Sequence, residues 1–187
     1  IFVHGKEVKI KSPAQAIRAG IAFLTEDRKG QGLILPESIK HNVVLASMKK
    51  FSRGLFLNYK EIEEASEKNI SDLKIKTPSA DERAGQLSGG NQQKVVVGKW
   101  VNTNADIYIF DEPTRGIDVG AKIEVYNVMN QLVKQGKCVI MVSSELQEIV
   151  SIADRVIVLS NGLKTGEFFG DEIEQDTLVL ASYKGHH

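Results

Sequence analysis

Residues 107–114 read Ile-Tyr-Ile-Phe-Asp-Glu-Pro-Thr, an apolar run that ends in two adjacent carboxylates and a proline. Four consecutive apolar residues predict a buried strand of the kind found in the parallel sheet of an α/β protein. Such sheets bind ligands at the carboxyl ends of their strands, where Asp111 and Glu112 would lie. One carboxylate could hold Mg²⁺ there, while the other could orient or deprotonate a water. The alternative is that both acids only cap a strand end in solvent.

Helices and strands alternate on both sides of this strand. The pattern predicts helices over about 90–102 and 119–135, a short helix from Leu146, and strands over 21–24, 138–142 and 155–159. A covered parallel sheet is the expected result. The turn signal Asn161-Gly162 predicts that 163–169 returns as an antiparallel edge strand. Near the start we expect a hairpin over 1–10 and a helix opened by a capping box at 12–15.

The segment between Pro36 and Leu87 has no strand pattern and predicts helices over about 38–51 and 59–76. We therefore expect one partial α/β domain over 1–187, N-terminally truncated because Ile1 lies inside a predicted strand. Its sheet lobe would comprise 1–35 and 87–170, with an all-helical subdomain over about 36–86. Residues 171–187 would be a tail whose end, Lys-Gly-His-His, resembles the start of an expression tag.

Residues 87–94, Leu-Ser-Gly-Gly-Asn-Gln-Gln-Lys, stand immediately before a predicted helix. Gly89 and Gly90 would let a ligand approach the backbone closely, and the amides and dipole of the first helical turn favour an anion. Ser88 adds a hydroxyl donor. The structural alternative is an N-cap serine followed by a flexible entry.

The composition is that of an ordinary globular protein, with 42% hydrophobic and 26% charged residues and a formal net charge of zero. Balanced charge argues against nucleic acid as a main partner. The apolar runs are too short to cross a bilayer. The single cysteine, Cys138, excludes an internal disulfide and suits a reducing compartment; its apolar context predicts a buried thiol.

In their order and spacing, residues 87–92 and 107–114 resemble the signature and Walker B motifs of ATP-binding cassette (ABC) ATPases, and 115–118 stand at the position of the D-loop. The resemblance implies a P-loop NTPase-like fold that uses ATP and Mg²⁺. It is closer still to the second cassette of tandem-cassette bacterial importers of ribose, galactose or xylose. Further details that carry it lie at 12–21, 25–29, 91–94 and 114–122, although nucleoside importers share parts of this pattern.

The resemblance assigns roles residue by residue. Nucleotide held by the preceding cassette of the same polypeptide would meet a set of residues in this chain: Ser88, Gly89, Gly90, Gln92 and Asp118. Asp111 would hold the metal and Glu112 would be catalytic. Glu26 stands where the family usually has a metal-approaching glutamine; it could meet a metal or be a solvated acid beside Arg28 and Lys29. Ser144 occupies the position of the switch histidine, a degenerate replacement that instead fits a capping box over 144–147.

A phosphate loop of the form G-x-x-x-x-G-K-(S/T) is absent from the 187 residues. The chain alone should therefore bind ATP poorly and be inactive, whereas the intact protein would be an ATPase. The expected partners are the preceding cassette, transmembrane permease subunits and, indirectly, a periplasmic sugar-binding protein, at the cytoplasmic face of the bacterial membrane. The alternatives are a non-hydrolytic regulatory cassette, or a soluble ABC ATPase that acts on nucleic acid or ribosomes.

Overall fold

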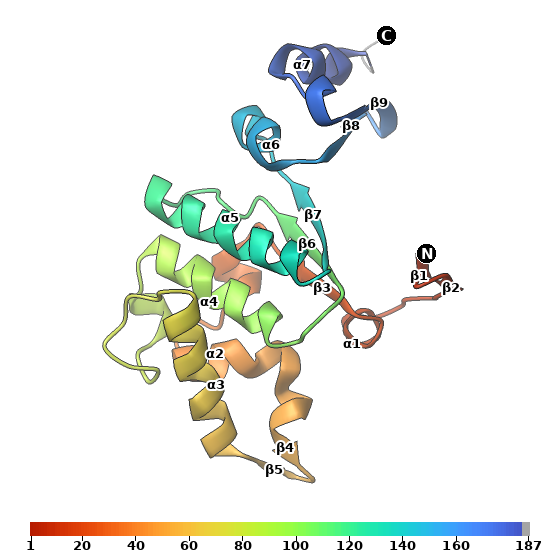
Figure 1. Ribbon diagram of the computed structural model, residues 1–187. Helices are drawn as coiled ribbons and strands as arrows, with labels where there is room; N and C mark the ends of the chain where they lie inside the picture. The colour runs from red at the N-terminus through yellow and green to blue at the C-terminus, as the bar shows by residue number, and fades with distance from the viewer. Residues whose placement is uncertain (185–187) are drawn as a thin grey trace. The chain divides into compact units, whose positions relative to one another are not determined.

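The computed structural model describes residues 1–184 and divides into two compact units, which meet in sequence between Val142 and Ser143 (Figure 1). The tag-like residues Gly185, His186 and His187 lie outside the described part. None of the helices among residues 1–184 combines the length and apolar composition that crossing a bilayer requires.

The first unit is built on a parallel sheet in the order β3 (Ile21–Leu24), β6 (Ile107–Asp111) and β7 (Cys138–Val142). The predicted strand limits are confirmed to within one residue. The register places Leu24 beside Phe110, and Phe110 beside Met141. The carboxyl ends of all three strands therefore share one edge of the sheet.

Within residues 1–142, one face of this sheet is buried and the other is about half exposed. Ala22, Leu24, Tyr108 and Phe110 are all at most 1% exposed, whereas Phe23, Ile140 and Val142 on the other face are about half exposed. Helix α4 (Gly89–Val101) packs near β3, and α5 (Val119–Lys134) packs near β7. The expectation of a sheet covered on both faces was therefore wrong for these strands. The expectation of a buried Cys138 was also wrong, because it lies on an exposed position at the start of β7.

The N-terminal segments follow their sequence signals. The hairpin of β1 (Phe2–Val3) and β2 (Lys6–Glu7) turns at His4 and Gly5, both with positive φ. Helix α1 (Pro13–Arg18) begins at an N-cap serine whose side chain accepts from the N–H of Gln15. The glutamine side chain bonds the N–H of Lys11 rather than that of Ser12, so the capping box is half formed.

The subdomain between β3 and α4 contains α2 (Ile39–Val44), the 3₁₀ helix η2 (Leu45–Phe51) and α3 (Tyr59–Asp72). Its predicted all-helical character was wrong in one place, because β4 (Ser52–Arg53) and β5 (Phe56–Leu57) form a small hairpin. Two-residue strands are too short for an alternating pattern to reveal. The π-helical turn η1 (Arg28–Gly32) and the 3₁₀ turn η3 (Ala84–Gln86) stand where the chain enters and leaves the subdomain.

The second unit consists of α6 (Leu146–Ile152), β8 (Arg155–Ser160), β9 (Leu163–Phe169), the 3₁₀ turn η4 (Gly170–Glu172) and α7 (Gln175–Tyr183). Asn161 and Gly162 both have positive φ, as the predicted type I′ turn requires. The predicted antiparallel return of β9 beside β8 is confirmed, but the expectation that β8 also pairs with the parallel strands was wrong. A two-residue turn closes this hairpin at little loss of chain entropy. Val156, Ile173 and Leu178 form the core of the unit.

Candidate functional site

The loops that follow β3 and β6 leave the same edge of the sheet. Glu26, two residues after β3, forms an ion pair with Arg115, four residues after β6. This contact places Glu26 at the edge that also carries Asp111 and Glu112. The sequence left open a metal contact or a solvated acid at this position, and the structure adds an ion pair with Arg115 that neither alternative foresaw.

Asp111 and Glu112 differ in their backbone conformation. Asp111 is the last residue of β6 and lies beside Val142 in the register. The N–H of Glu112 still donates to the carbonyl oxygen of Val142, at 2.9 Å, but its φ is +46°. A left-handed conformation is uncommon for a non-glycine residue and is concentrated at functional sites. It turns the chain off the sheet, so that both side chains stand at the carboxyl edge, half-buried.

A ready-made metal centre is not found here, because residues 1–184 contain no group of three or more His, Cys, Asp or Glu side chains close enough to hold an ion. In nucleotide sites Mg²⁺ is bound by one or two carboxylates together with phosphate oxygens and water. Asp111, half-buried at a strand end, is of the right chemical type for such a single-carboxylate contact.

Ser88 occupies the N-cap position of α4, but its side chain makes no hydrogen bond to the amides of the first turn. Its hydroxyl instead accepts from the side-chain amide of Asn91, at 3.0 Å. Ser88 therefore stands at the N-cap position, as the structural alternative required, but it does not cap the helix through its side chain. The first N–H groups of a helix have no partner within the helix, so they remain for a ligand or for water.

Gly90 allows α4 and α5 to approach each other closely. A Cβ atom at Gly90 would stand 2.7 Å from the Cβ of Ala121 and 3.3 Å from a carboxylate oxygen of Asp118. Asp118 itself caps α5 by accepting from the N–H of Ala121, at 3.0 Å. The structure thus brings the signature-like turn and the predicted D-loop together.

Gln92 is placed differently from the other predicted ligand residues. Its side chain is buried, at 5% exposure, and donates to the carbonyl oxygen of Ala84 at 3.2 Å. Its own amide oxygen is buried without a hydrogen-bond partner. Gln92 therefore packs beneath the first turn of α4 and does not face solvent.

Sequence reasoning missed Arg28 as a neighbour of this turn. Its Nη2 atom lies 3.2 Å from the position that a Cβ of Gly89 would take, and the carbonyl oxygen of Gly116 lies 3.4 Å from the same point. Burial lowers the pKa of the Arg28 guanidinium. Nothing in the spacing signalled this contact, because about sixty residues separate Arg28 from Gly89 in the chain.

In the second unit the predicted capping role of Ser144 was wrong. Helix α6 has Glu145 at its N-cap. The hydroxyl that organises this start belongs to Ser143, which accepts from the N–H of Glu145 at 3.1 Å and donates to the buried carboxylate of Glu148. Ser143 takes the position expected of Ser144 because its hydroxyl bonds both the backbone and a side chain that is itself buried.

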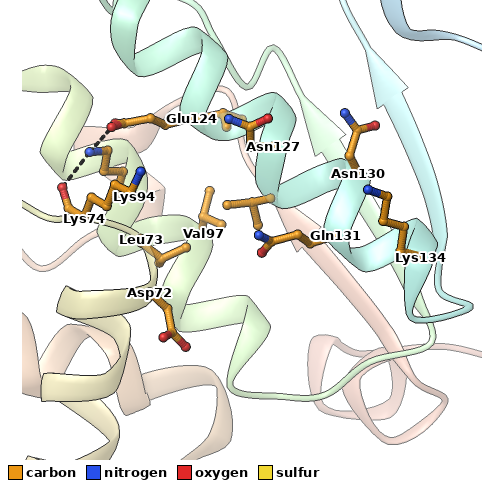
Figure 2. A pocket seen from close by; sticks show the side chains of 12 residues that line it. Asp72, Leu73, Lys74, Lys94, Val97, Glu124, Asn127, Asn130, Gln131 and Lys134 are labelled. Carbon is orange, nitrogen blue, oxygen red and sulfur yellow. Dashed lines mark hydrogen bonds and ion pairs between the residues drawn. The ribbon is translucent and has the colours of Figure 1, made fainter.

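A cavity of about 260 Å³ lies apart from these residues, between the end of α3 and the helices α4 and α5 (Figure 2). Lys94 on α4 crosses it, pairing with Glu124 on α5 and donating to the carbonyl oxygen of Lys74 at 2.8 Å. None of the predicted site residues lines this cavity. These contacts join α4 to α5 and to the segment that follows α3.

The parallel sheet, the carboxylate pair at its edge and the glycine turn at the start of α4 are typical of P-loop NTPase-like domains. The family model described as "ABC transporter" matches residues 1–115. This chain belongs to the ABC transporter family.

Curated relatives match nearly the whole chain. The xylose import ATP-binding protein XylG of Thermoanaerobacter pseudethanolicus is 45% identical over 185 residues, which cover 99% of this chain and 37% of the relative. The ribose import ATP-binding protein RbsA of Bacillus cereus gives the same figures. The chain thus spans little more than a third of the length of these relatives.

Solved ABC cassettes share the fold. The cassette MJ1267 in its ADP conformation matches with a TM-score of 0.74 and 22% identity, covering 96% of this chain and 74% of that one. The dimeric cassette MJ0796 bound to ADP and phosphate matches with a TM-score of 0.71 and 21% identity, covering 86% and 68%. The expected α/β, P-loop NTPase-like fold is confirmed.

Proposed function

We propose that this chain is the signature-bearing part of the second cassette in a sugar importer's ATP-binding polypeptide. The observation that carries the proposal is the first turn of α4, where the Ser88 side chain leaves the helix amides uncapped and Gly89 adds no side chain over them. The relatives named for ribose and xylose import support the sugar class of substrate.

In this proposal the turn at Ser88–Gly90 binds the terminal phosphate of an ATP molecule held by the preceding cassette. Helix amides and a positive dipole end suit that phosphate. Asp118 orders the adjacent turn through its bond to the N–H of Ala121. ATP binding would then close the pair of cassettes, and release of the cleaved phosphate after hydrolysis would remove the bridging charge and let the pair reopen. Gln92 would support this turn from below.

Asp111 and Glu112 would belong to a second site, whose phosphate loop we place in a preceding part of the polypeptide. Asp111 would hold Mg²⁺ and Glu112 would orient or deprotonate the attacking water. Glu26 would approach the metal from the loop after β3. Ser144, at the switch-histidine position, cannot act as an imidazole base, so we expect this site to be the weaker of the two.

The remaining partners follow from the same proposal. Transmembrane permease subunits would meet the helical subdomain at the cytoplasmic face of the bacterial membrane, and a periplasmic sugar-binding protein would act on them indirectly. A second candidate, a cassette that regulates without hydrolysis, is favoured at one site by Ser144. An ABC ATPase acting on nucleic acid is disfavoured by the net charge of zero.

The test uses the full-length polypeptide assembled with its permease in lipid vesicles, with ATP turnover and sugar uptake both measured. Ser88→Arg places a bulky side chain on the turn and should abolish both activities. Ser182→Arg, on an exposed position of α7 outside the helical subdomain, is the matched control and should leave them unchanged. Normal turnover by Ser88→Arg would refute the proposed role of the turn. The isolated 187-residue chain should show no turnover.

A further inference from the structure

Apart from Glu26, the segment Thr25–Lys29 has no role in the function proposed above, although part of it lies against α4. Asp27 accepts from the N–H of Gly30 at 2.9 Å and thereby caps η1. The other end of η1 is fixed by Lys99 of α4, which donates to the carbonyl oxygen of Gly32 at 2.6 Å. These two contacts hold Arg28 at the start of α4.

Arg28 is a half-buried cation that no acid in the described part of the chain pairs with. Among residues 1–184 it makes no ion pair or side-chain hydrogen bond, and its Nε atom is fully buried. The acids on the neighbouring segments are engaged elsewhere. Glu26 pairs with Arg115, while Asp27 and Asp118 keep their charge but each direct one oxygen to a backbone N–H group, and none of the three forms an ion pair with Arg28.

The guanidinium also lies at the electrostatically unfavourable end of a helix. Helix α4 is 13 residues long, and its N-terminus carries the positive end of the dipole. A cation beside Gly89 adds a second positive charge, whereas an anion bound between the two would be attracted by both. The positive charges of Arg28 and of the helix end therefore repel each other when no ligand is bound, and an anionic ligand between them offsets that repulsion.

We propose that Arg28 is a further phosphate-binding residue of the signature site, contacting the terminal phosphate of the ATP that the turn at Ser88–Gly90 binds. This inference rests on the proposed function. The planar guanidinium group of Arg28 can donate to two oxygens of one phosphate. Loss of that phosphate on hydrolysis restores the uncompensated charge at the interface. The site thereby distinguishes a triphosphate from a diphosphate and favours separation of the cassettes after turnover.

The experiment measures equilibrium binding of a non-hydrolysable ATP analogue and of ADP to the full-length polypeptide in its permease complex. Analogue binding that Ser88→Arg removes defines the signature site. Arg28→Ala should weaken that binding by roughly tenfold or more, the size expected for a charge-assisted contact, and leave ADP binding unchanged. Arg28→Lys, which keeps the charge but not the planar guanidinium group, should lie between. Lys29→Ala, an exposed neighbour, is the matched control and should be neutral.

Each outcome decides the inference. Unchanged analogue binding in Arg28→Ala, with Ser88→Arg still disruptive, would overturn the role of Arg28 alone. If Ser88→Arg were also without effect, the proposed function would fail first. Equal weakening of analogue and ADP together with a lowered Tm would show that Arg28 is only a packing residue. If Arg28→Ala does not fold, Arg28→Lys is measured instead, provided that its Tm is native. The ratio of its affinity for the analogue to its affinity for ADP then decides.

Discussion

The ammonium group of Lys99 donates to the carbonyl oxygen of Gly32 across 2.6 Å, joining the signature helix to the turn that carries Arg28. The same group lies 5.4 Å from the ring centre of Trp100. Only 8% of Lys99 is exposed. Burial lowers its pKa from 10.5 to about 8, because the charged form loses its hydration.

This lowered pKa predicts a pH-dependent stability. The unfolded chain binds more protons than the folded one between pH 8 and 10.5, so the free energy of unfolding should rise with pH across that window. The full rise would be about 3 kcal/mol. Lys99→Met should flatten it, and denaturant unfolding at a series of pH values measures the difference. Lys76→Met, at an exposed position, is the control. Equal pH slopes in Lys99→Met and the parent would contradict the prediction.

We expect Glu112 to lower the stability of the fold while serving catalysis. Its side chain is in the proposed site, and its φ is +46°. Asparagine tolerates this backbone conformation better than glutamate does. Glu112→Asn should therefore raise the free energy of unfolding by up to about 1 kcal/mol. Glu112→Gln keeps the backbone preference of glutamate and should leave stability unchanged. Both should reduce ATP turnover in the full transporter. A less stable Glu112→Asn would show that the conformation is not strained.

The sequence predicted strands β6 and β7 well because each is a short, wholly apolar run bounded by polar residues. The turns at Gly5 and Gly162 were predictable because an asparagine- or glycine-containing pair signals positive φ. These are local properties of the chain. The candidate ligand residues Ser88, Gly89 and Asp118 were likewise visible through their order along the chain.

The parts that could not be predicted depend on contacts between distant segments. Arg28 reaches the turn at Gly89 only because η1 is fixed to α4 through Gly32. Ser143, and not Ser144, organises the start of α6 because its hydroxyl reaches the buried Glu148 side chain. Periodicity and local capping rules contain no information about either contact.

Gly90 should be intolerant of a side chain, since its Cβ would stand 2.7 Å from the Cβ of Ala121. Gly90→Ala forces α4 and α5 apart and should lower the free energy of unfolding by about 1–3 kcal/mol. Gly120→Ala is the control, because the nearest atom to its Cβ would be a side-chain oxygen of Asp118, at 3.2 Å. Chemical denaturation of both variants measures the contrast. Equal stability of the two would mean that the helices move apart freely.

A nearly isosteric substitution of Asn42 should lower the free energy of unfolding strongly. It is fully buried, accepts from the N–H of Ile34 at 2.8 Å, and donates to the carbonyl oxygens of Ile34, Glu37 and Ser38. Asn42→Asp would turn a carboxylate toward three carbonyls and should cost about 3 kcal/mol or more at neutral pH. Part of the loss should return at low pH, where the carboxyl group is protonated. A pH-independent deficit in thermal unfolding would argue against this cause.

The ion pair of Glu26 and Arg115 predicts opposite effects of its two members on the Mg²⁺ requirement. Both side chains are substantially exposed, at 46% and 67%, so either change should alter stability by less than about 1 kcal/mol. If Glu26 approaches the metal as proposed, Arg115 competes for the same carboxylate. Arg115→Gln should then lower the Mg²⁺ concentration at half-maximal ATP turnover in the full transporter, whereas Glu26→Gln should raise it. Lys29→Gln removes a nearby charge outside the pair and serves as the control. Shifts in the same direction for both variants, or no shift in either, would mean that Glu26 only pairs with Arg115 and does not approach the metal.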